Sequence, residues 1–238
     1  MPKPSSNSDI HIGSLFSDPI NAPIEALSPD TIKKRVQDHD VTFQLTEIQK
    51  TLLDYWVSLP KTAHPLVPCK ADISLPRLYK IAPHLGMVED ISPGQVNVRL
   101  MGSTADDLLN ENLTNQNVYD HYDCHSKDWA HGIFRNMFDT PAGLTNTLLY
   151  NFNKKPAFSH KTFHLPLCDK EGSIKYVIST FEQYEVHVDL RDYEPALVNK
   201  NDFSDNYSID LGAGPGSPPF PLRDKGKNMV LKIADLAK

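Results

Sequence analysis

The segment QVNVRLM, residues Gln95–Met101, alternates polar and apolar side chains as far as Leu100. Such alternation is typical of a β-strand with one buried face, and it predicts that Val96, Val98 and Leu100 lie on the same side. A short apolar run at 85–91 precedes the segment, and the turn residues Ser-Pro-Gly separate the two. The two segments therefore predict an antiparallel hairpin.

Helical spacing replaces this alternation further along the chain. A short helix is predicted after Ser103, with two aspartates in its first turn, and a longer helix is predicted over 126–139. Three strand-like segments follow, at about 144–152, 159–167 and 174–186, with turn residues between them. This order predicts an α+β domain, in which a five-stranded antiparallel sheet carries helices on one face.

An extra amphipathic helix is predicted before the hairpin. Thr46 and Gln49 have the spacing of a capping box, and an apolar stripe follows them as far as a proline. Prolines are dense at both ends of the chain, where no apolar period is sustained. We therefore expect mostly disordered segments at 1–43 and 189–238, and one domain over 44–188 that includes the helix.

Charge and hydropathy argue against several classes of protein. The 238-residue chain has a formal net charge of −6, which disfavours nucleic acid or an anionic membrane as a partner. No apolar run reaches the length of a membrane span, and the first residues lack the apolar core of a signal peptide. Cys69, Cys124 and Cys168 are far apart and form no Cys-x-x-Cys pair, so we expect reduced thiols and a cytoplasmic location rather than a disulfide framework.

Several short motifs follow one another in an order that is typical of one family. A helix carrying LLDYW (52–56) is followed by PCKADI (68–73), by a strand with VRLMGST (98–104) and later by LPL (165–167). With this order and spacing the chain resembles a family of bacterial stand-alone PAS-like domains. The resemblance covers about residues 45–184 and implies the PAS arrangement of sheet and helices.

The chain departs from the family's pattern at a turn and at one basic residue. Two glycines of the family's Gly-x-Asp/Glu-Leu-Thr-Gly turn are Asn110 and Asn115 here. Asparagine tolerates a left-handed backbone better than other residues with a side chain, so we expect the turn to survive. Lys70 stands where the family often has arginine, a replacement that would weaken a bidentate contact.

The resemblance implies sensing or regulation and names no cofactor. We expect a module that binds a small ligand, a protein partner or both, without catalytic output of its own. The sequence contains no nucleophile elbow, phosphate-binding glycine loop or metalloprotease motif, so an enzyme is not predicted. The alternative is a structural adaptor or dimerisation module whose core is filled by its own side chains.

A candidate ligand pocket lies between the sheet and the helix layer that the resemblance implies. Small-molecule sites are mostly apolar, so a pocket and a plain core have the same composition, and a plain core remains the alternative. The candidate lining residues are Val98, Leu100, Leu109, Phe134, Met137, Phe138, Tyr150, Phe163 and Leu165.

Two polar side chains are candidate anchors for a ligand. Arg99 suits an anionic group, and an ion pair with Asp106 or Asp107 is the alternative. His160 shares its strand face with His164. Because the apolar residues of that strand have the other parity, alternation favours a solvent-facing position for both histidines.

The leading helix carries the candidate surface for a partner. Leu52, Tyr55 and Trp56 form part of its apolar stripe, and the helix lies outside the predicted unit of sheet and helices. An unpaired apolar stripe is a means of contacting another protein or a second copy of the chain. We therefore expect this helix to mediate partner binding or a homodimer contact.

A loop before the longer helix holds the densest group of metal-ligating residue types. His121, Cys124 and His125 have spacing that allows two of them to converge on one ion. The sequence offers no second pair of ligands nearby, and solvated loop residues commonly show such spacing. No metal site is therefore predicted.

Overall fold

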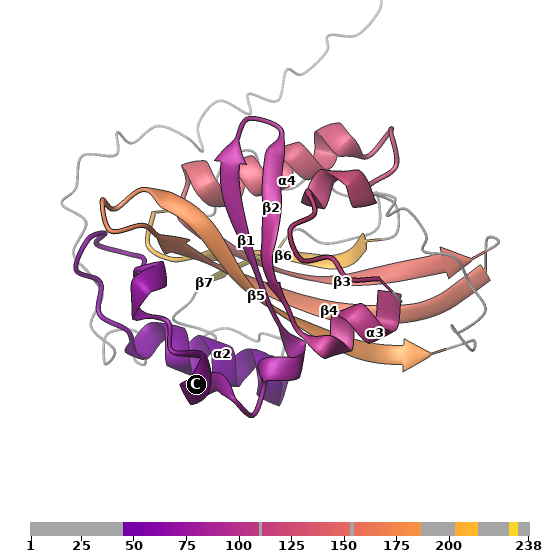
Figure 1. Cartoon of the computed structure of the whole chain (residues 1–238), viewed down its shortest axis with the longest axis horizontal. Coiled ribbons are helices and arrows are strands. Elements are labelled where there is room, and N and C mark those ends of the chain that lie inside the picture. The colour runs from indigo at the N-terminus through magenta and orange to yellow at the C-terminus, as the bar shows by residue number, and fades with distance from the viewer. Residues whose placement is uncertain (1–44, 110, 153–154, 187–202, 214–228, 233–238) are drawn as a thin grey trace, which may run out of the picture.

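The structure is a computed structural model that describes residues 45–109, 111–152, 155–186, 203–213 and 229–232. Short 3₁₀ turns connect several of its elements, and none of the helices in this described part is long and apolar enough to cross a membrane. The helices are α2 (Glu47–Ser58), α3 (Ser103–Leu109) and α4 (Lys127–Asp139), and the strands are β1 (Leu85–Ser92), β2 (Gln95–Met101), β3 (Ala142–Phe152), β4 (Lys155–Cys168), β5 (Ile174–Val186), β6 (Phe203–Asp210) and β7 (Met229–Lys232) (Figure 1).

The described strands form one sheet in the order β2-β1-β5-β4-β3-β6-β7. Neighbours from β2 to β6 are antiparallel, and β7 pairs parallel with β6. The α+β prediction is confirmed, but the prediction of five strands is wrong. Strands β6 and β7 come from the segment 189–238, whose prolines predicted a disordered tail. Without β6, strand β3 would be an edge strand with unpaired N–H and C=O groups. Strand β6 pairs with these groups.

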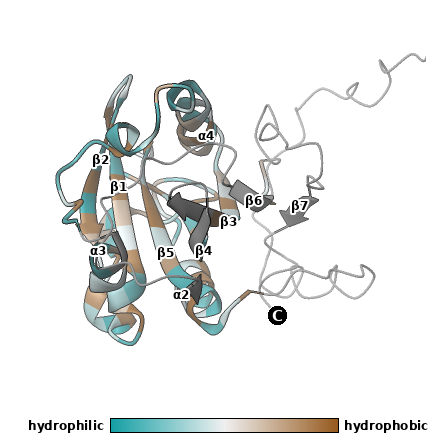
Figure 2. Cartoon of the chain, turned by 90° about the vertical axis from the view of Figure 1, so that its right-hand side faces the viewer, coloured by the Kyte–Doolittle hydropathy of each residue, from teal (hydrophilic) through white to brown (hydrophobic). Residues whose placement is uncertain are grey.

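Helices α2 and α4 lie on opposite faces of the sheet (Figures 1 and 2). The extra helix α2 packs in one core cluster with apolar residues of β4 and β5, among them Phe163 and Ile178. Helix α4 packs in a second cluster that includes Leu144 and Val177. The adjacent residues Val177 and Ile178 therefore belong to different clusters, as the alternation of side chains along a strand requires. We call the two sides of the sheet the α2 face and the α4 face.

The N-terminal end of α2 has the predicted capping box. The Thr46 hydroxyl accepts a hydrogen bond from the Gln49 backbone N–H at 3.2 Å. The Gln49 side-chain oxygen accepts one from the Thr46 N–H, also at 3.2 Å. Two backbone donors that the helix itself cannot satisfy are thereby paired, which explains why α2 begins at this point.

Strand β2 contains a bulge that the alternation did not predict. Met87 pairs with Leu100, but the next residue of β1, Val88, pairs with Val98, so that Arg99 is the extra residue. An extra residue in one strand reverses the facing of the side chains beyond it. Val98 therefore packs on the α4 face and Leu100 on the α2 face, and the prediction that they share a side is wrong.

The residues around Asn115 cover the outer edge of β2. Asn115 has a φ of 70°, which confirms the left-handed conformation predicted for it, whereas Asn110 lies outside the described residues. The Asn115 N–H donates to the Val98 carbonyl oxygen at 2.8 Å, and the Val98 N–H donates to the Gln116 carbonyl oxygen at 2.9 Å. The Asn117 side chain accepts from the Val96 N–H at 3.1 Å. The turn thus bonds to β2 in place of a further strand.

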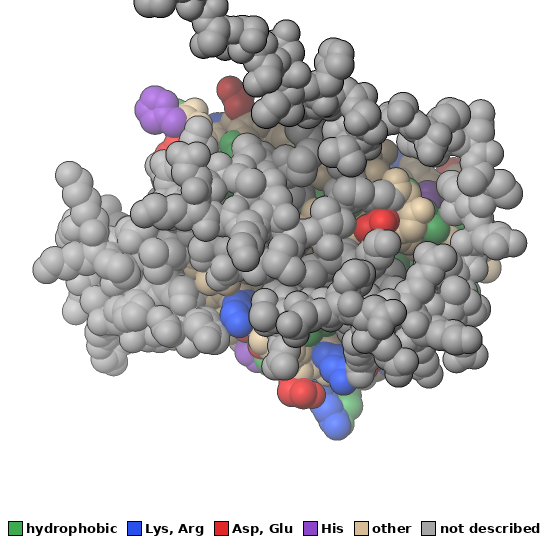
Figure 3. Space-filling model, turned by 180° about the vertical axis from the view of Figure 1, so that it is seen from behind, with side chains coloured by type: hydrophobic (Ala, Val, Ile, Leu, Met, Phe, Trp, Pro, Cys, Tyr) green, Lys and Arg blue, Asp and Glu red, His purple; other side chains and the backbone are tan. Residues whose placement is uncertain are grey.

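Large apolar side chains are seldom exposed on the described surface. Among the described residues, the exposed large apolar side chains are Leu75, Tyr79 and Ile91. Tyr79 is the most exposed, at 68%. On the side shown in Figure 3, the clearly visible Lys and Arg side chains lie towards the lower edge, with an acidic side chain beside them.

Candidate functional site: a buried polar row on the sheet

Strand β4 places polar and apolar side chains on opposite faces of the sheet. Phe163 and Leu165 are fully buried in the cluster beneath α2. His164 pairs with Leu144 of β3, a residue of the α4 cluster, and therefore points to the α4 face. The prediction that the histidines face solvent is wrong for His160, which is 3% exposed. The alternation was recognised correctly, but a helix layer lies on each face of the sheet, so His160 is buried on the second face and His164 is half-buried there.

Four polar side chains on the α4 face form one chain of hydrogen bonds, which we call the polar row. Ser179 Oγ lies 2.7 Å from His164 Nδ1, and His164 Nε2 lies 2.9 Å from Thr162 Oγ1. The Thr162 hydroxyl in turn donates to the side-chain oxygen of Asn146 at 2.6 Å. The row spans three adjacent strands, β5, β4 and β3.

Donor and acceptor rules give this row a direction. Because the Thr162 hydroxyl donates its proton to Asn146, its oxygen accepts from His164 Nε2–H. His164 Nδ1 is then free of a proton and accepts from the Ser179 hydroxyl. Burial lowers the pKa of His164 to about 4, which is consistent with this neutral imidazole.

His160 lies next to the row and is also neutral at physiological pH. Its burial, and secondarily the neighbouring His164, lower the pKa of His160 to about 3. The ring of Phe181 contacts both imidazoles edge-on, with centroid distances of 6.0 Å to His160 and 6.3 Å to His164. The same ring occupies the space above Gly86, where an added Cβ would lie 2.4 Å from the Phe181 ring. A glycine at position 86 therefore leaves room for the aromatic ring beside the histidines.

The predicted apolar pocket is divided between the two faces of the sheet. Val98, Phe134, Met137 and Phe138 do come together in the α4 cluster. The other described candidates do not join them, because Phe163, Leu165 and Leu100 pack on the α2 face. The side chains of Leu109 and Tyr150 lie outside the described residues. The prediction of one pocket lined by the whole set is therefore wrong.

Arg99 makes an ion pair, but with a partner that the sequence did not indicate. Its guanidinium contacts the Glu89 carboxylate on the neighbouring strand β1, rather than Asp106 or Asp107. The bulge places Arg99 on the outside, and its side chain is 41% exposed. These contacts favour the structural alternative over a ligand anchor.

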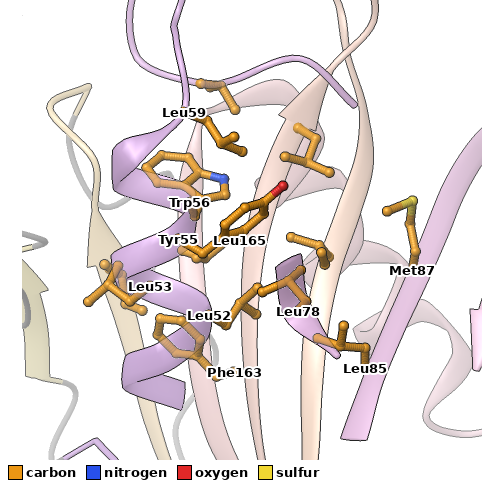
Figure 4. Packing of buried hydrophobic residues seen from close by; sticks show 14 of the residues in the cluster. Leu52, Leu53, Tyr55, Trp56, Leu59, Leu78, Leu85, Met87, Phe163 and Leu165 are labelled. Carbon is orange, nitrogen blue, oxygen red and sulfur yellow. The ribbon is translucent and has the colours of Figure 1, made fainter. Parts of the chain in front are cut away.

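The apolar stripe of α2 is used inside the domain. Leu52, Tyr55 and Trp56 are 0%, 7% and 1% exposed, and Figure 4 shows them packed beside Phe163, Leu165 and Leu78. The prediction that this stripe contacts a partner is therefore wrong. A stripe of this kind has the same sequence pattern whether it covers its own sheet or another chain.

The loop residues considered as metal ligands remain separate from any cluster. Cys124 and His125 are exposed, and His121 Nδ1 lies 4.0 Å from a Glu111 carboxylate oxygen. Among the residues that the structure describes, no group of three or more His, Cys, Asp or Glu side chains could hold a metal ion.

Sequence reasoning missed three members of the polar row. Asn146, Thr162 and Ser179 are each 3% exposed, which is unusual for polar residues in the middle of a sheet. A signal was present, because Thr162 has the same parity as both histidines. Two histidines and a threonine at alternate positions of a central strand indicate a polar stripe. The partners on β3 and β5 required the register of the sheet.

The chain was compared with curated proteins and with solved structures. No curated protein matches the chain. Among solved structures, a LOV protein from Rhodobacter sphaeroides is similar at 16% identity and a TM-score of 0.35, covering 47% of this chain and 68% of that one. The VqmA dimer of Vibrio cholerae is similar at 13% identity and a TM-score of 0.33, covering 48% of this chain and 52% of that one. These two likenesses are too distant to carry an argument about activity.

The family comparison is decisive for classification. A family model described as "PAS domain" matches residues 46–180. The matched range begins at the N-cap of α2 and ends on β5. It therefore includes the extra helix, the β1–β2 hairpin and all four residues of the polar row. It covers more than half of the 238 residues, and the chain belongs to the PAS domain family.

Proposed function

We propose that this sensory or regulatory module recognises a small, uncharged polar ligand through the polar row and the adjoining His160. The observation that carries the proposal is the chain of hydrogen bonds from Ser179 through His164 and Thr162 to Asn146. A sheet face that serves only as a core is normally filled by apolar side chains, since these bury no polar group. The four polar side chains of the row could give up hydrogen bonds to one another and form hydrogen bonds with a ligand instead.

The charge state of the site favours the ligand class. The histidines are neutral at physiological pH because burial lowers the pKa of His160 to about 3 and that of His164 to about 4. A buried ion without a partner of opposite charge is costly, so a charged ligand would fit this row poorly. Donors and acceptors of hydroxyl, amide and imidazole type suit hydroxyl, carbonyl or amide groups on the ligand. The edge of the Phe181 ring adds an apolar contact beside them.

The output of such a module would pass to another protein or to a second copy of the chain. In this proposal the module has no reaction of its own. The Ser179 hydroxyl does hydrogen-bond to His164, but a pKa of about 4 makes this imidazole a weak general base. Ligand binding would then act by exchanging hydrogen bonds within the row, which joins β3, β4 and β5. Light scattering with and without a bound compound would report a change in oligomeric state.

Two threonine variants test whether the polar row binds the ligand. Thr162→Val breaks the row at its centre, whereas Thr180→Val is a matched control on the neighbouring strand. Thr180 is fully buried, faces the α2 side through its pairing with Phe163, and its hydroxyl has no hydrogen-bond partner among the described residues. Valine has nearly the same volume as threonine, so both changes should preserve packing.

The measurement is native mass spectrometry of freshly purified protein, followed by thermal shift with neutral, cationic and anionic metabolites. We expect the wild type and Thr180→Val to retain or respond to a neutral compound, and Thr162→Val to lose that response. If no protein retains a mass and no compound shifts the unfolding midpoint by about 1 °C or more, the self-filled adaptor is the correct alternative. A response that survives in Thr162→Val would place the ligand elsewhere.

A further inference from the structure

Cys69 and Cys168 lie side by side although they are 99 positions apart in the sequence. Their sulfur atoms are 3.3 Å apart, and the two residues form an isolated parallel β-bridge. The Cys168 N–H donates to the Pro68 carbonyl oxygen at 3.0 Å, which ties the two backbones together. The expectation of separate thiols was drawn from spacing along the chain, and such spacing carries no information about a neighbour across the sheet.

We propose that Cys69 and Cys168 are a modification site, at which a reversible intramolecular disulfide forms under oxidising conditions. A disulfide has a sulfur–sulfur bond of about 2.05 Å, so the two sulfurs need to approach by only about 1.2 Å. Neighbouring strands are about 4.8 Å apart, which lies within the range of Cα separations that disulfides span. Rotation of the two side chains should therefore be enough to bring the sulfurs into bonding distance, with little movement of the backbones.

The reduced pair is also accommodated, which makes the change reversible. Cys69 Sγ lies 3.5 Å from the Asp169 carbonyl oxygen, and Cys168 Sγ lies 3.6 Å from the Val67 carbonyl oxygen. Each thiol therefore has an acceptor for its proton. The third cysteine, Cys124, is exposed, whereas both members of the pair are buried.

The surroundings indicate which sulfur reacts first. Cys168 is fully buried, and burial together with the adjacent Cys69 raises its pKa to about 12, so it stays protonated at neutral pH. Cys69 is 6% exposed and lies nearer the surface. We therefore assign Cys69 as the sulfur that meets the oxidant and Cys168 as the sulfur that resolves the intermediate.

Hydrogen peroxide is the small oxidant for which the chemistry balances. The Cys69 sulfur attacks one peroxide oxygen, the O–O bond breaks, and the departing hydroxide leaves as water after taking the thiol proton. The Cys168 sulfur then attacks the sulfur of the sulfenic acid, the S–O bond breaks, and a second water leaves with the Cys168 proton. Two electrons pass from the sulfur pair to the peroxide, and a dithiol such as dithiothreitol returns them.

The bond would join the segment that follows α2 to the end of β4. That segment is already held to the sheet nearby, because Trp56 donates to the Pro166 carbonyl oxygen two residues before Cys168. Closing a loop of this length restricts the unfolded chain considerably. Oxidation would therefore lock the extra helix to the sheet, and reduction would release the lock without loss of a native contact.

The test uses the full chain carrying Cys124→Ser, which removes the exposed thiol and leaves only the pair. The protein is treated with hydrogen peroxide or dithiothreitol, denatured, alkylated with N-ethylmaleimide and weighed intact. We expect both thiols to be alkylated after reduction and neither after peroxide, with a digest that contains the Cys69 and Cys168 peptides joined. The midpoint of thermal unfolding should rise by about 5–15 °C on oxidation and return with dithiothreitol.

A second variant keeps the test informative. In the Cys124→Ser background, Cys168→Ala should show no peroxide-dependent rise of the midpoint and should gain oxygen at Cys69 instead. If the Cys124→Ser chain still alkylates both thiols after peroxide, or gains oxygen atoms rather than losing two hydrogens, the disulfide is overturned. A disulfide that forms without any rise of the midpoint would overturn its role as a lock.

Discussion

The indole N–H of Trp56 donates a hydrogen bond to the carbonyl oxygen of Pro166, 2.9 Å away. Proline is rare in a central strand because it lacks an N–H for the ladder, and β4 lies between β5 and β3. The pairing of β3 with β4 ends at His164, so Pro166 lies beyond it. The indole therefore satisfies a carbonyl group that β3 does not reach, and α2 is joined to the sheet by a polar contact as well as by its apolar stripe.

Trp56→Phe should destabilise the domain by about 2–3 kcal/mol. The change leaves the buried Pro166 carbonyl oxygen without this donor and removes part of a large buried ring. Urea unfolding followed by circular dichroism measures the effect. Tyr79→Phe is the control, since Tyr79 is 68% exposed and should change the free energy of unfolding by less than about 0.5 kcal/mol. Equal effects for the two variants would contradict the role given to the indole.

Stability should fall between about pH 6.5 and pH 4, because the folded structure lowers the pKa of both His160 and His164. Burial lowers the folded pKa of His160 to about 3 and that of His164 to about 4, whereas an unfolded histidine has a pKa of about 6.5. Within this window the unfolded chain binds more protons than the folded one, so the free energy of unfolding increases with pH. Above about pH 6.5 this contribution is complete.

His164→Gln removes one of the two titrating imidazoles, so its contribution to the pH dependence of stability can be measured. Near pH 5 the variant should have a slope of unfolding free energy against pH that is smaller by about 1.4 kcal/mol per pH unit, the value for one proton. Urea titrations at half-unit pH steps provide the slope. Thr180→Val removes no titrating group and should keep the wild-type slope. An unchanged slope in His164→Gln would mean that this imidazole is not held neutral.

Two asparagines in one turn should respond in opposite ways to glycine. Asn115 has a φ of 70°, so Asn115→Gly should be neutral or should stabilise by up to about 1 kcal/mol. Asn112 accepts a hydrogen bond from the Thr114 N–H at 2.9 Å, so Asn112→Gly should destabilise by about 1 kcal/mol. The comparison needs only chemical denaturation of the two variants under identical conditions. Destabilisation by Asn115→Gly would count against the left-handed backbone.

Two glycines with positive φ should differ in their tolerance of alanine. Gly94 has a φ of 82° and Gly172 a φ of 87°, so each alanine variant bears a similar backbone penalty of about 1 kcal/mol. An added Cβ at Gly172 would also lie 2.5 Å from the Ala63 carbonyl oxygen, whereas at Gly94 its nearest neighbour is a His131 atom at 3.5 Å. Thermal unfolding should therefore show a clearly larger loss for Gly172→Ala, and a larger loss for Gly94→Ala would contradict the placement of the 169–172 turn.

Local patterns in the sequence predicted the elements and the helix cap, because alternation and capping are set by neighbours along the chain. The facing of Leu100 was missed, since a one-residue bulge is determined by the pairing with Met87. The burial of His160 was missed because a second helix layer covers the other side of the sheet. Contacts across strands, such as Ser179 with His164 or Cys69 with Cys168, depend on register and have no local signature.

The bonded turn at Asn115–Asn117 has a consequence for how the protein behaves at high concentration. An exposed strand edge is a template on which another chain can extend the sheet, and such growth leads towards aggregates. Along β2, the N–H groups of Val96 and Val98 and the carbonyl of Val98 are already occupied by this turn. A neighbouring molecule therefore finds no free hydrogen-bonding groups at these positions, and the turn protects the protein from edge-to-edge polymerisation at β2.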